Sequence, residues 1–170
     1  MKKYFMIIFI VFNFLGIMIF SKNSIDRMKL KKIKDLVSIA HSGVKYFHSL
    51  FVNGNMTEIE AKNHAKEFIS TLRHGHKNKN YFWIFGYNSK ILMHPYIKRL
   101  VGMNISKLKD SKDKNYLKKL RDICVKNGKG YVIFHWYYRE SKNNDGPKIA
   151  YGKSFKPWQW IIFGSIYLEE

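Results

Sequence analysis

Aromatic side chains, and in one case a lysine, recur two residues apart in the short apolar runs that begin at residue 81. Tyr81 and Trp83 are two residues apart, as are Tyr151 and Lys153, so each pair would share one face of a strand. Tyrosine and tryptophan donate hydrogen bonds, and lysine adds a positive charge. Such a face could neutralise and orient a small anion, which favours binding of a solute over covalent chemistry.

The residues that could serve catalysis or metal binding are not spaced in the sequence as a catalytic or metal site requires. His74 and His76 lie two residues apart, with no cysteine, carboxylate or third histidine near them in the chain. His41 and His48 are seven residues apart, not the four of a helical metal pair. The 12 acidic residues include no pair suited to acid–base catalysis. We therefore expect no enzyme, no catalytic residue, no metal site and no cofactor.

The composition indicates one folded domain with a strong basic bias. The chain has 170 residues, of which 46% are hydrophobic and 16% aromatic, which excludes disorder. The net charge of +19 raises the alternative of a nucleic-acid partner. The lysines are spread from Lys2 to Lys156 without a single tract, so we interpret them as solvated and expect no nucleic acid. The single Cys124 excludes an intrachain disulfide and is expected in the core.

An uncharged apolar run near the N-terminus predicts a membrane anchor. It covers residues 4–20, at the short end of the roughly 17–25 residues of a spanning helix. No small-x-small cleavage site follows it, which disfavours a cleaved signal peptide, and a buried helix is the third interpretation. Lys2 and Lys3 favour a cytoplasmic N-terminus, although six basic residues on the other flank oppose that orientation. We expect residues 1–23 to anchor the chain in a membrane with the N-terminus inside, and residues 24–170 to lie on the outer side.

The periodicity of the remaining chain predicts an α+β fold. Apolar residues spaced by threes and fours predict a long helix over 24–50 that continues from the anchor. The capping box Thr57-x-x-Glu60 begins a second helix that ends near Arg73. Short apolar runs then predict a five-stranded antiparallel sheet, with a helix over 115–126 between its second and third strands. The predicted strands are 81–85, 90–94, 130–138, 148–154 and 160–167.

The ordered motifs from residue 81 onward resemble the single Cache domain of bacterial chemoreceptors and sensor histidine kinases. The matching segments are YFWIF, MHP, GMNISKLKD, GYVIFHWYY and YGKSFKPWQW. The resemblance implies a PAS-like five-stranded sheet carried on a long helix, with a small ligand on one face of the sheet. In such receptors a second membrane span follows the last strand and leads to signalling modules.

The resemblance also implies which side chains meet the ligand, which in this family is often a small carboxylate. Lys153 and His94 are expected to contact the anion, in a cavity enclosed between Trp83, His94 and Lys153. Trp158 and Trp160 are expected to be structural. The implied ligand-binding residues are Arg73, Tyr81, Trp83, His94, Trp136, Tyr151 and Lys153.

These observations predict an extracytoplasmic ligand-binding sensor domain that forms a homodimer through its long helix. Ligand binding would shift the population of sheet and helix arrangements, and the helix would transmit the change. The alternatives are a membrane-anchored dimerisation or adaptor module without a ligand and, less favoured, a basic nucleic-acid-binding protein.

Overall fold

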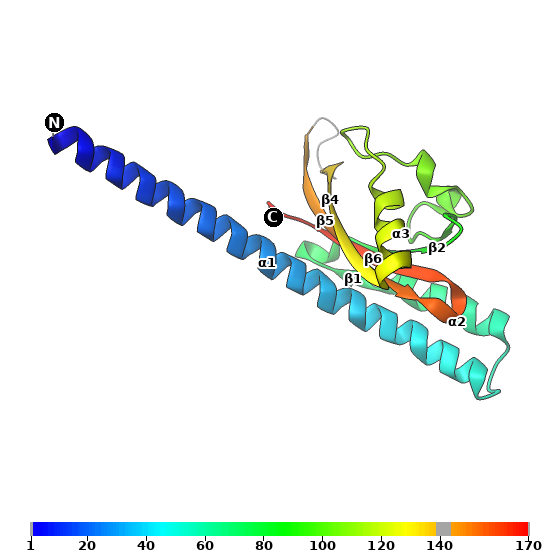
Figure 1. The fold of residues 1–170 in the computed structure, drawn as a ribbon. Coiled ribbons are helices and arrows are strands. Elements are labelled where there is room, and N and C mark those ends of the chain that lie inside the picture. Colours follow the sequence, from blue (N-terminus) through cyan, green and yellow to red (C-terminus); the bar gives the residue numbers. More distant parts are fainter. Residues whose placement is uncertain (1, 139–143, 170) are drawn as a thin grey trace.

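The computed structural model describes the backbone of residues 2–138 and 144–169, and the side chains of residues 24–138 and 144–169. Within these ranges the chain forms an α+β fold in which helices pack on both faces of an antiparallel sheet (Figure 1). The helices are α1 (Lys2–Val52), α2 (Glu58–Thr71) and α3 (Tyr116–Asn127). The strands are β1 (Arg73–His74), β2 (Asn80–Gly86), β3 (Ile91–Met93), β4 (Lys129–Tyr137), β5 (Asp145–Phe155) and β6 (Trp160–Tyr167).

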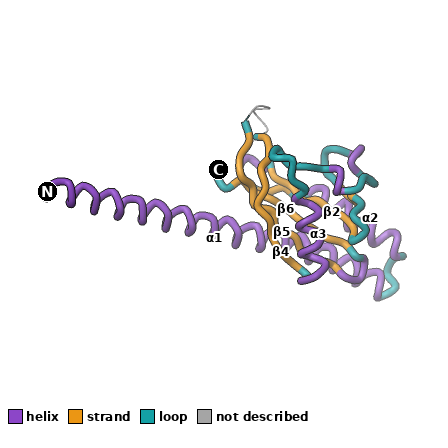
Figure 2. The backbone as a smooth tube through the Cα atoms, turned by 45° about the horizontal axis from the view of Figure 1, so that its top comes forward, coloured by secondary structure: helices purple, strands orange, loops and turns teal. Residues whose placement is uncertain are grey.

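Helix α1 is a single element of 51 residues that includes the helix predicted over 24–50, and its N-terminal part projects away from the domain (Figure 2). Ile33, Val37, Ala40 and Val44 recur every three or four residues and are completely buried. No helix within the described residues is long and apolar enough to cross a membrane. The predicted anchor run, 4–20, lies outside the residues whose side chains are described, so the anchor stays a prediction.

The boundary between α1 and α2 follows the turn signals in the sequence. Helix α1 ends before Gly54, whose positive φ of 74° is a backbone conformation that glycine adopts without strain. The capping box forms: the Glu60 N–H donates to Thr57 Oγ1 at 3.3 Å, and the Thr57 N–H donates to Glu60 Oε2 at 2.8 Å. Helix α2 ends at Thr71, two residues before the predicted end.

The sheet has six strands rather than the predicted five. The strand order is β1-β2-β6-β5-β4, and β3 also pairs with β2. The five predicted strands are all present, with ends shifted by no more than three residues. The sixth strand, β1, contains only Arg73 and His74, which pair with Tyr81 and Asn80. Two polar residues at the end of a helix are too few for an alternating pattern, which is why the sequence did not predict this strand.

The two faces of the sheet are covered differently. On the first, which we call the helix face, α1 and α2 bury a continuous apolar core. On the second, the pocket face, α3 packs on β4 and β5 (Figure 1). Cys124 of α3 is fully buried there, as predicted, and burial raises the pKa of its thiol to about 12. A Cβ atom at Gly152 would lie 2.9 Å from the Cys124 Sγ, so glycine allows α3 to approach the sheet closely.

Candidate functional site

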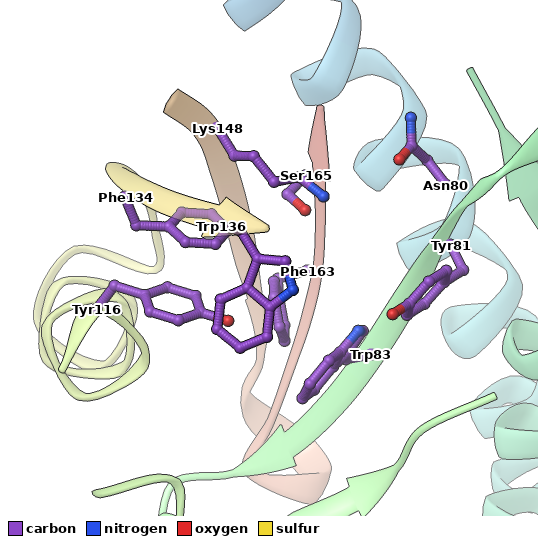
Figure 3. A pocket seen from close by; sticks show the side chains of 9 residues that line it. All are labelled: Asn80, Tyr81, Trp83, Tyr116, Phe134, Trp136, Lys148, Phe163 and Ser165. Atoms are coloured by element: carbon purple, nitrogen blue, oxygen red, sulfur yellow. The ribbon is translucent and has the colours of Figure 1, made fainter. Parts of the chain in front are cut away.

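A small chamber opens on the pocket face beside the first turn of α3 (Figure 3). We call it the inner chamber, and its volume is about 30 Å³. Strand alternation builds it, because residues two apart on β2, β4 and β6 all point to this face. Its lining residues are Asn80, Tyr81, Trp83, Tyr116, Phe134, Trp136, Lys148, Phe163 and Ser165.

One wall of the inner chamber is a stack of aromatic rings between α3 and β4. The Tyr116 ring lies parallel to the Phe134 ring with 3.8 Å between centroids, and the Trp136 ring meets Tyr116 edge-on at 6.1 Å. Burial raises the pKa of the Tyr116 phenol far above its usual range, so the hydroxyl remains protonated. Figure 3 shows this hydroxyl turned toward Trp136, where it can donate a hydrogen bond to a ligand.

The opposite wall is formed by β2 and is supported from behind by His94. The rings of Tyr81 and Trp83 are nearly parallel, 6.3 Å apart, and the His94 ring lies 4.1 Å from the Trp83 ring. His94 Nδ1 accepts hydrogen bonds from the backbone N–H groups of Tyr96 and Ile97, at 3.1 and 2.9 Å. Burial lowers the pKa of His94 to about 4. The imidazole is therefore neutral, carries its proton on Nε2 and holds Trp83 in place.

Lys148 brings a positive charge to the chamber from β5. Of the described residues that line the inner chamber, Lys148 is the one with a positively charged side chain, and none has an acidic side chain. Its Nζ lies 4.3 Å from the centroid of the Tyr167 ring, a cation–π distance. The Lys148 side chain lies next to the hydroxyl of Ser165 (Figure 3), and an anion bound in the chamber would contact it.

A second and larger chamber adjoins the first. This outer chamber has a volume of about 480 Å³ and shares Asn80, Tyr81, Trp136 and Lys148 with the inner chamber. Tyrosines and lysines dominate its lining. The further residues that line it are His76, Lys77, Lys79, Tyr137, Tyr138 and Tyr167.

The structure brings together three of the seven residues that the sequence assigned to the site. Tyr81, Trp83 and Trp136 line the inner chamber, and His94 lies directly behind Trp83. Arg73 does not line either chamber. Its Nη1 donates to the backbone carbonyls of Ser70 and Leu72 at 2.7 and 2.8 Å, at the C-terminal end of α2. Its guanidinium also packs over the Tyr96 ring, with 4.7 Å between Cζ and the centroid.

Tyr151 and Lys153 lie on the other face of the sheet. Tyr151 belongs to the core of the helix face, and Lys153 pairs with Ile162, whose side chain is in that same core. The expected cavity between Trp83, His94 and Lys153 therefore does not form. The reason is strand alternation: Lys148 and Lys153 are separated by an odd number of positions on β5, so they point to opposite faces.

The sequence also missed residues that the structure places in the inner chamber. Alternation from Trp136 would have reached Phe134, and alternation along the last strand joins Phe163 to Ser165. Lys148 could not be found this way, since nothing in the sequence says which face of β5 carries the chamber. The missed residues are Asn80, Tyr116, Phe134, Lys148, Phe163 and Ser165.

The two histidines of the HGH segment point to different environments. His74 is buried and packs on Phe82, with 4.9 Å between ring centroids, whereas His76 lines the outer chamber. Within residues 24–138 and 144–169, no group of three or more His, Cys, Asp or Glu side chains could hold a metal ion.

Comparison with known proteins relates this arrangement to bacterial sensors. The sequence profile described as single Cache domain 2 matches residues 25–170. The methyl-accepting chemotaxis protein McpP of Pseudomonas putida is 25% identical over 142 residues, which cover 84% of this chain and 26% of McpP. The chain thus spans about a quarter of the length of this curated relative.

Solved structures share the fold. One, described as the structural basis for carboxylic acid recognition by a Cache chemosensory domain, is 28% identical with a TM-score of 0.75 and covers 83% of this chain and 94% of its own. The periplasmic sensor domain of a chemotaxis protein is 26% identical with a TM-score of 0.72, over 81% and 93% of the two chains. A methyl-accepting chemotaxis protein from Vibrio parahaemolyticus, 22% identical with a TM-score of 0.72 over 89% and 96%, shares the fold.

Proposed function

We propose that this chain, which belongs to the single Cache domain 2 family, senses a small carboxylate that binds in the inner chamber. The family match and the similarity to a Cache domain that recognises carboxylic acids support a sensor of this kind over a catalytic role. The similarity to McpP supports its assignment to a bacterial chemotaxis receptor.

One observation carries the proposal: a chamber walled by aromatic rings in which a lysine and several neutral hydroxyl groups converge. A carboxylate there would pair with the Lys148 ammonium and accept hydrogen bonds from the Tyr81, Tyr116 or Ser165 hydroxyls. The rings of Trp83 and Trp136 would cover the ligand's carbon atoms and exclude water. Charge-assisted hydrogen bonds in such surroundings are stronger than in water.

Calorimetric titration of the purified full chain with acetate and propionate tests the proposal. Lys148→Met keeps the length of the side chain but removes the charge, and we expect it to weaken binding by about tenfold or more. Lys153→Met makes the same change on the same strand but on the helix face, and should leave the affinity unchanged. Binding of neither acid, or equal loss in both variants, would contradict the proposal. Urea unfolding of both variants checks that the fold is retained.

We further propose that residues 1–23 anchor the domain in the inner membrane, with residues 24–170 in the periplasm and α1 at the interface of a homodimer. The similarity to a periplasmic sensor domain and to a chemotaxis receptor supports this placement. Large apolar side chains on α1 remain exposed, including Met28 at 61% and Ile39 at 67%, and a second copy would cover them. Ile39→Cys should form an intermolecular disulfide in intact cells; a chain recovered only as monomer would contradict the dimer.

The contacts of Tyr167 give a route from the site to α1. The Lys29 Nζ donates to the backbone carbonyls of Tyr167 and Leu168, at 3.1 and 2.7 Å. The Tyr167 ring lines the outer chamber, and its hydroxyl donates to the Tyr137 carbonyl at 2.6 Å. A ligand that moves Tyr167 would therefore also move α1, and it would favour one of two arrangements of helix and sheet.

A further inference from the structure

We infer that the physiological ligand carries two anionic groups and occupies both chambers, with one carboxylate in the inner chamber and the second beside Lys77 and Lys79 in the outer one. The inference rests on the proposed function, because it takes carboxylate binding in the inner chamber as its premise. It adds the size and charge of the rest of the ligand.

The volumes of the two chambers limit how the ligand can be divided between them. A water molecule needs roughly 10–15 Å³ of such space, so the inner chamber, at about 30 Å³, holds only two or three water-sized groups. This is the size of a carboxylate group with little else. The outer chamber, at about 480 Å³, is within the range of roughly 300–1,000 Å³ of small-molecule sites. A ligand that fills the site therefore extends from the inner chamber into the outer one.

The charges of the outer chamber favour an anionic group in the part of the ligand that binds there. Lys77, Lys79 and Lys148 line it together with His76, and no carboxylate is among its described lining residues. Glu169 stands at the rim, where it accepts a hydrogen bond from the Tyr138 hydroxyl at 3.4 Å. The lysines give this part of the lining a positive charge, which favours an anionic group over a neutral one.

The backbone holds Lys77 in a conformation that supports a binding role. Lys77 has φ 49° and ψ 28°, and Asn78 follows with φ 54°, so two consecutive residues other than glycine are in the left-handed region. Asparagine adopts this conformation readily, but a lysine in it is strained and persists only where its surroundings enforce it, often at ligand sites. This turn connects β1 to β2 and places Lys77 and Lys79 along the outer chamber.

Aromatic side chains join the two charged ends. Tyr81 and Trp136 line both chambers, and Tyr137, Tyr138 and Tyr167 continue the aromatic lining outward. Their rings would pack against the carbon chain between the two carboxylates. Lys148 lines both chambers, so it would stand between the two anionic groups.

Matched pairs of acids test the inference by calorimetric titration of the full chain. Each pair has equal chain length: butyrate with succinate, valerate with glutarate, and hexanoate with adipate. We expect the dicarboxylate of the best-fitting pair to bind about tenfold more tightly than its monocarboxylate. Raising the salt from about 0.05 to about 0.5 M should reduce this ratio, because the outer chamber is open to solvent and its charges are screened.

A double variant locates the second anionic group. Lys77→Met with Lys79→Met should bring the affinity ratio of dicarboxylate to monocarboxylate close to one. Lys126→Met with Lys129→Met makes the same change of charge at two exposed positions, in the last turn of α3 and at the first residue of β4, and should leave the ratio unchanged. Equal affinities within every pair, or a ratio that is unchanged when Lys77 and Lys79 are replaced, would overturn this inference but not the proposed function. If no acid of either class binds, the proposed function itself fails.

Discussion

The two faces of the sheet use neighbouring residues of the same strands for opposite purposes. On β6, Ile162 is fully buried in the core of the helix face, while the next residue, Phe163, lines the inner chamber. On β5, Lys148 lines the chamber and Ile149 is buried beneath the helices. Both faces are apolar, so hydrophobicity does not distinguish the binding face from the closed one. The helices that cover each face make the difference.

Helix length explains why only one face is closed. Residues 24–52 of α1 extend roughly 43 Å at about 1.5 Å per residue, which exceeds the roughly 36 Å of the 11-residue strand β5. Helix α3 has 12 residues and extends only about 18 Å, so it covers about half of that strand. Ile105, Leu100 and Leu108, from the segment before α3, also pack on this face, and the aromatic side chains enclose the chambers beside the first turn of α3. The short α3 therefore creates the site, and substitutions on the two faces should have separable effects.

The largest expected effect is a loss of stability on the helix face. Ile162→Ala removes a completely buried side chain beneath α1 and should lower the free energy of unfolding by about 3 kcal/mol. Carboxylate affinity of the folded variant should stay within about twofold, because Ile162 points away from the chambers. Urea unfolding and calorimetry measure the two quantities. A stable variant with weakened binding would show that the faces are not independent.

Protonation should destabilise both faces, since each contains a buried histidine. Burial lowers the pKa of His94 to about 4, and burial with the charges of Lys148 and Lys32 lowers that of His74 to about 4. In the unfolded chain both have pKa values near 6.5. Between pH 6.5 and 4 the unfolded state therefore binds more protons, so stability is complete above pH 6.5 and falls as the pH decreases. The loss by pH 4 is on the order of 3 kcal/mol for each residue.

Two variants separate the contributions of the histidines. Urea unfolding between pH 4 and 7.5 is compared for the native chain, His74→Leu and His94→Asn. Each variant should lose less stability between pH 6.5 and 4 than the native chain, by the amount that its histidine contributes. The carboxylates, which titrate at the lower end of this window, affect all three proteins alike. For His94 the geometry gives the reason: protonating Nδ1 would remove both hydrogen bonds from Tyr96 and Ile97. Identical profiles would contradict the burial of both residues.

Much of the fold could be predicted from local patterns in the sequence. The spacing of Ile33, Val37, Ala40 and Val44 indicates the buried stripe of α1, and the capping box at Thr57 marks the start of α2. These features depend on residues close together in the chain. The two-residue strand β1 could not be predicted, because its pairing with β2 is its only distinguishing feature.

The site was predicted only in part, because strand alternation shows which residues share a face but not which face is open. Trp83 and Trp136, which belong to motifs of the family, line the inner chamber, and their contact with a ligand stays a prediction. Lys153 was predicted because its position matches a family motif, yet the register of β5 with β6 puts it on the helix face. Arg73 was assigned to the ligand, but it binds the carbonyl groups at the end of α2. Both errors concern tertiary contacts that the sequence alone does not contain.

The smallest expected effect on stability, with a clear effect on binding, comes from Ser165 on the pocket face. Ser165→Val adds volume to a chamber of about 30 Å³ and should weaken carboxylate binding about tenfold, while the free energy of unfolding changes by less than about 1 kcal/mol. Ser165→Ala removes the hydroxyl but keeps the space, so it separates a steric effect from a lost hydrogen bond. Ser165 lies three residues after Ile162 on the same strand, facing the other way. If Ser165→Val destabilised the chain as much as Ile162→Ala, the pocket face would be packed as tightly as the helix face, and calorimetry would then detect no carboxylate binding.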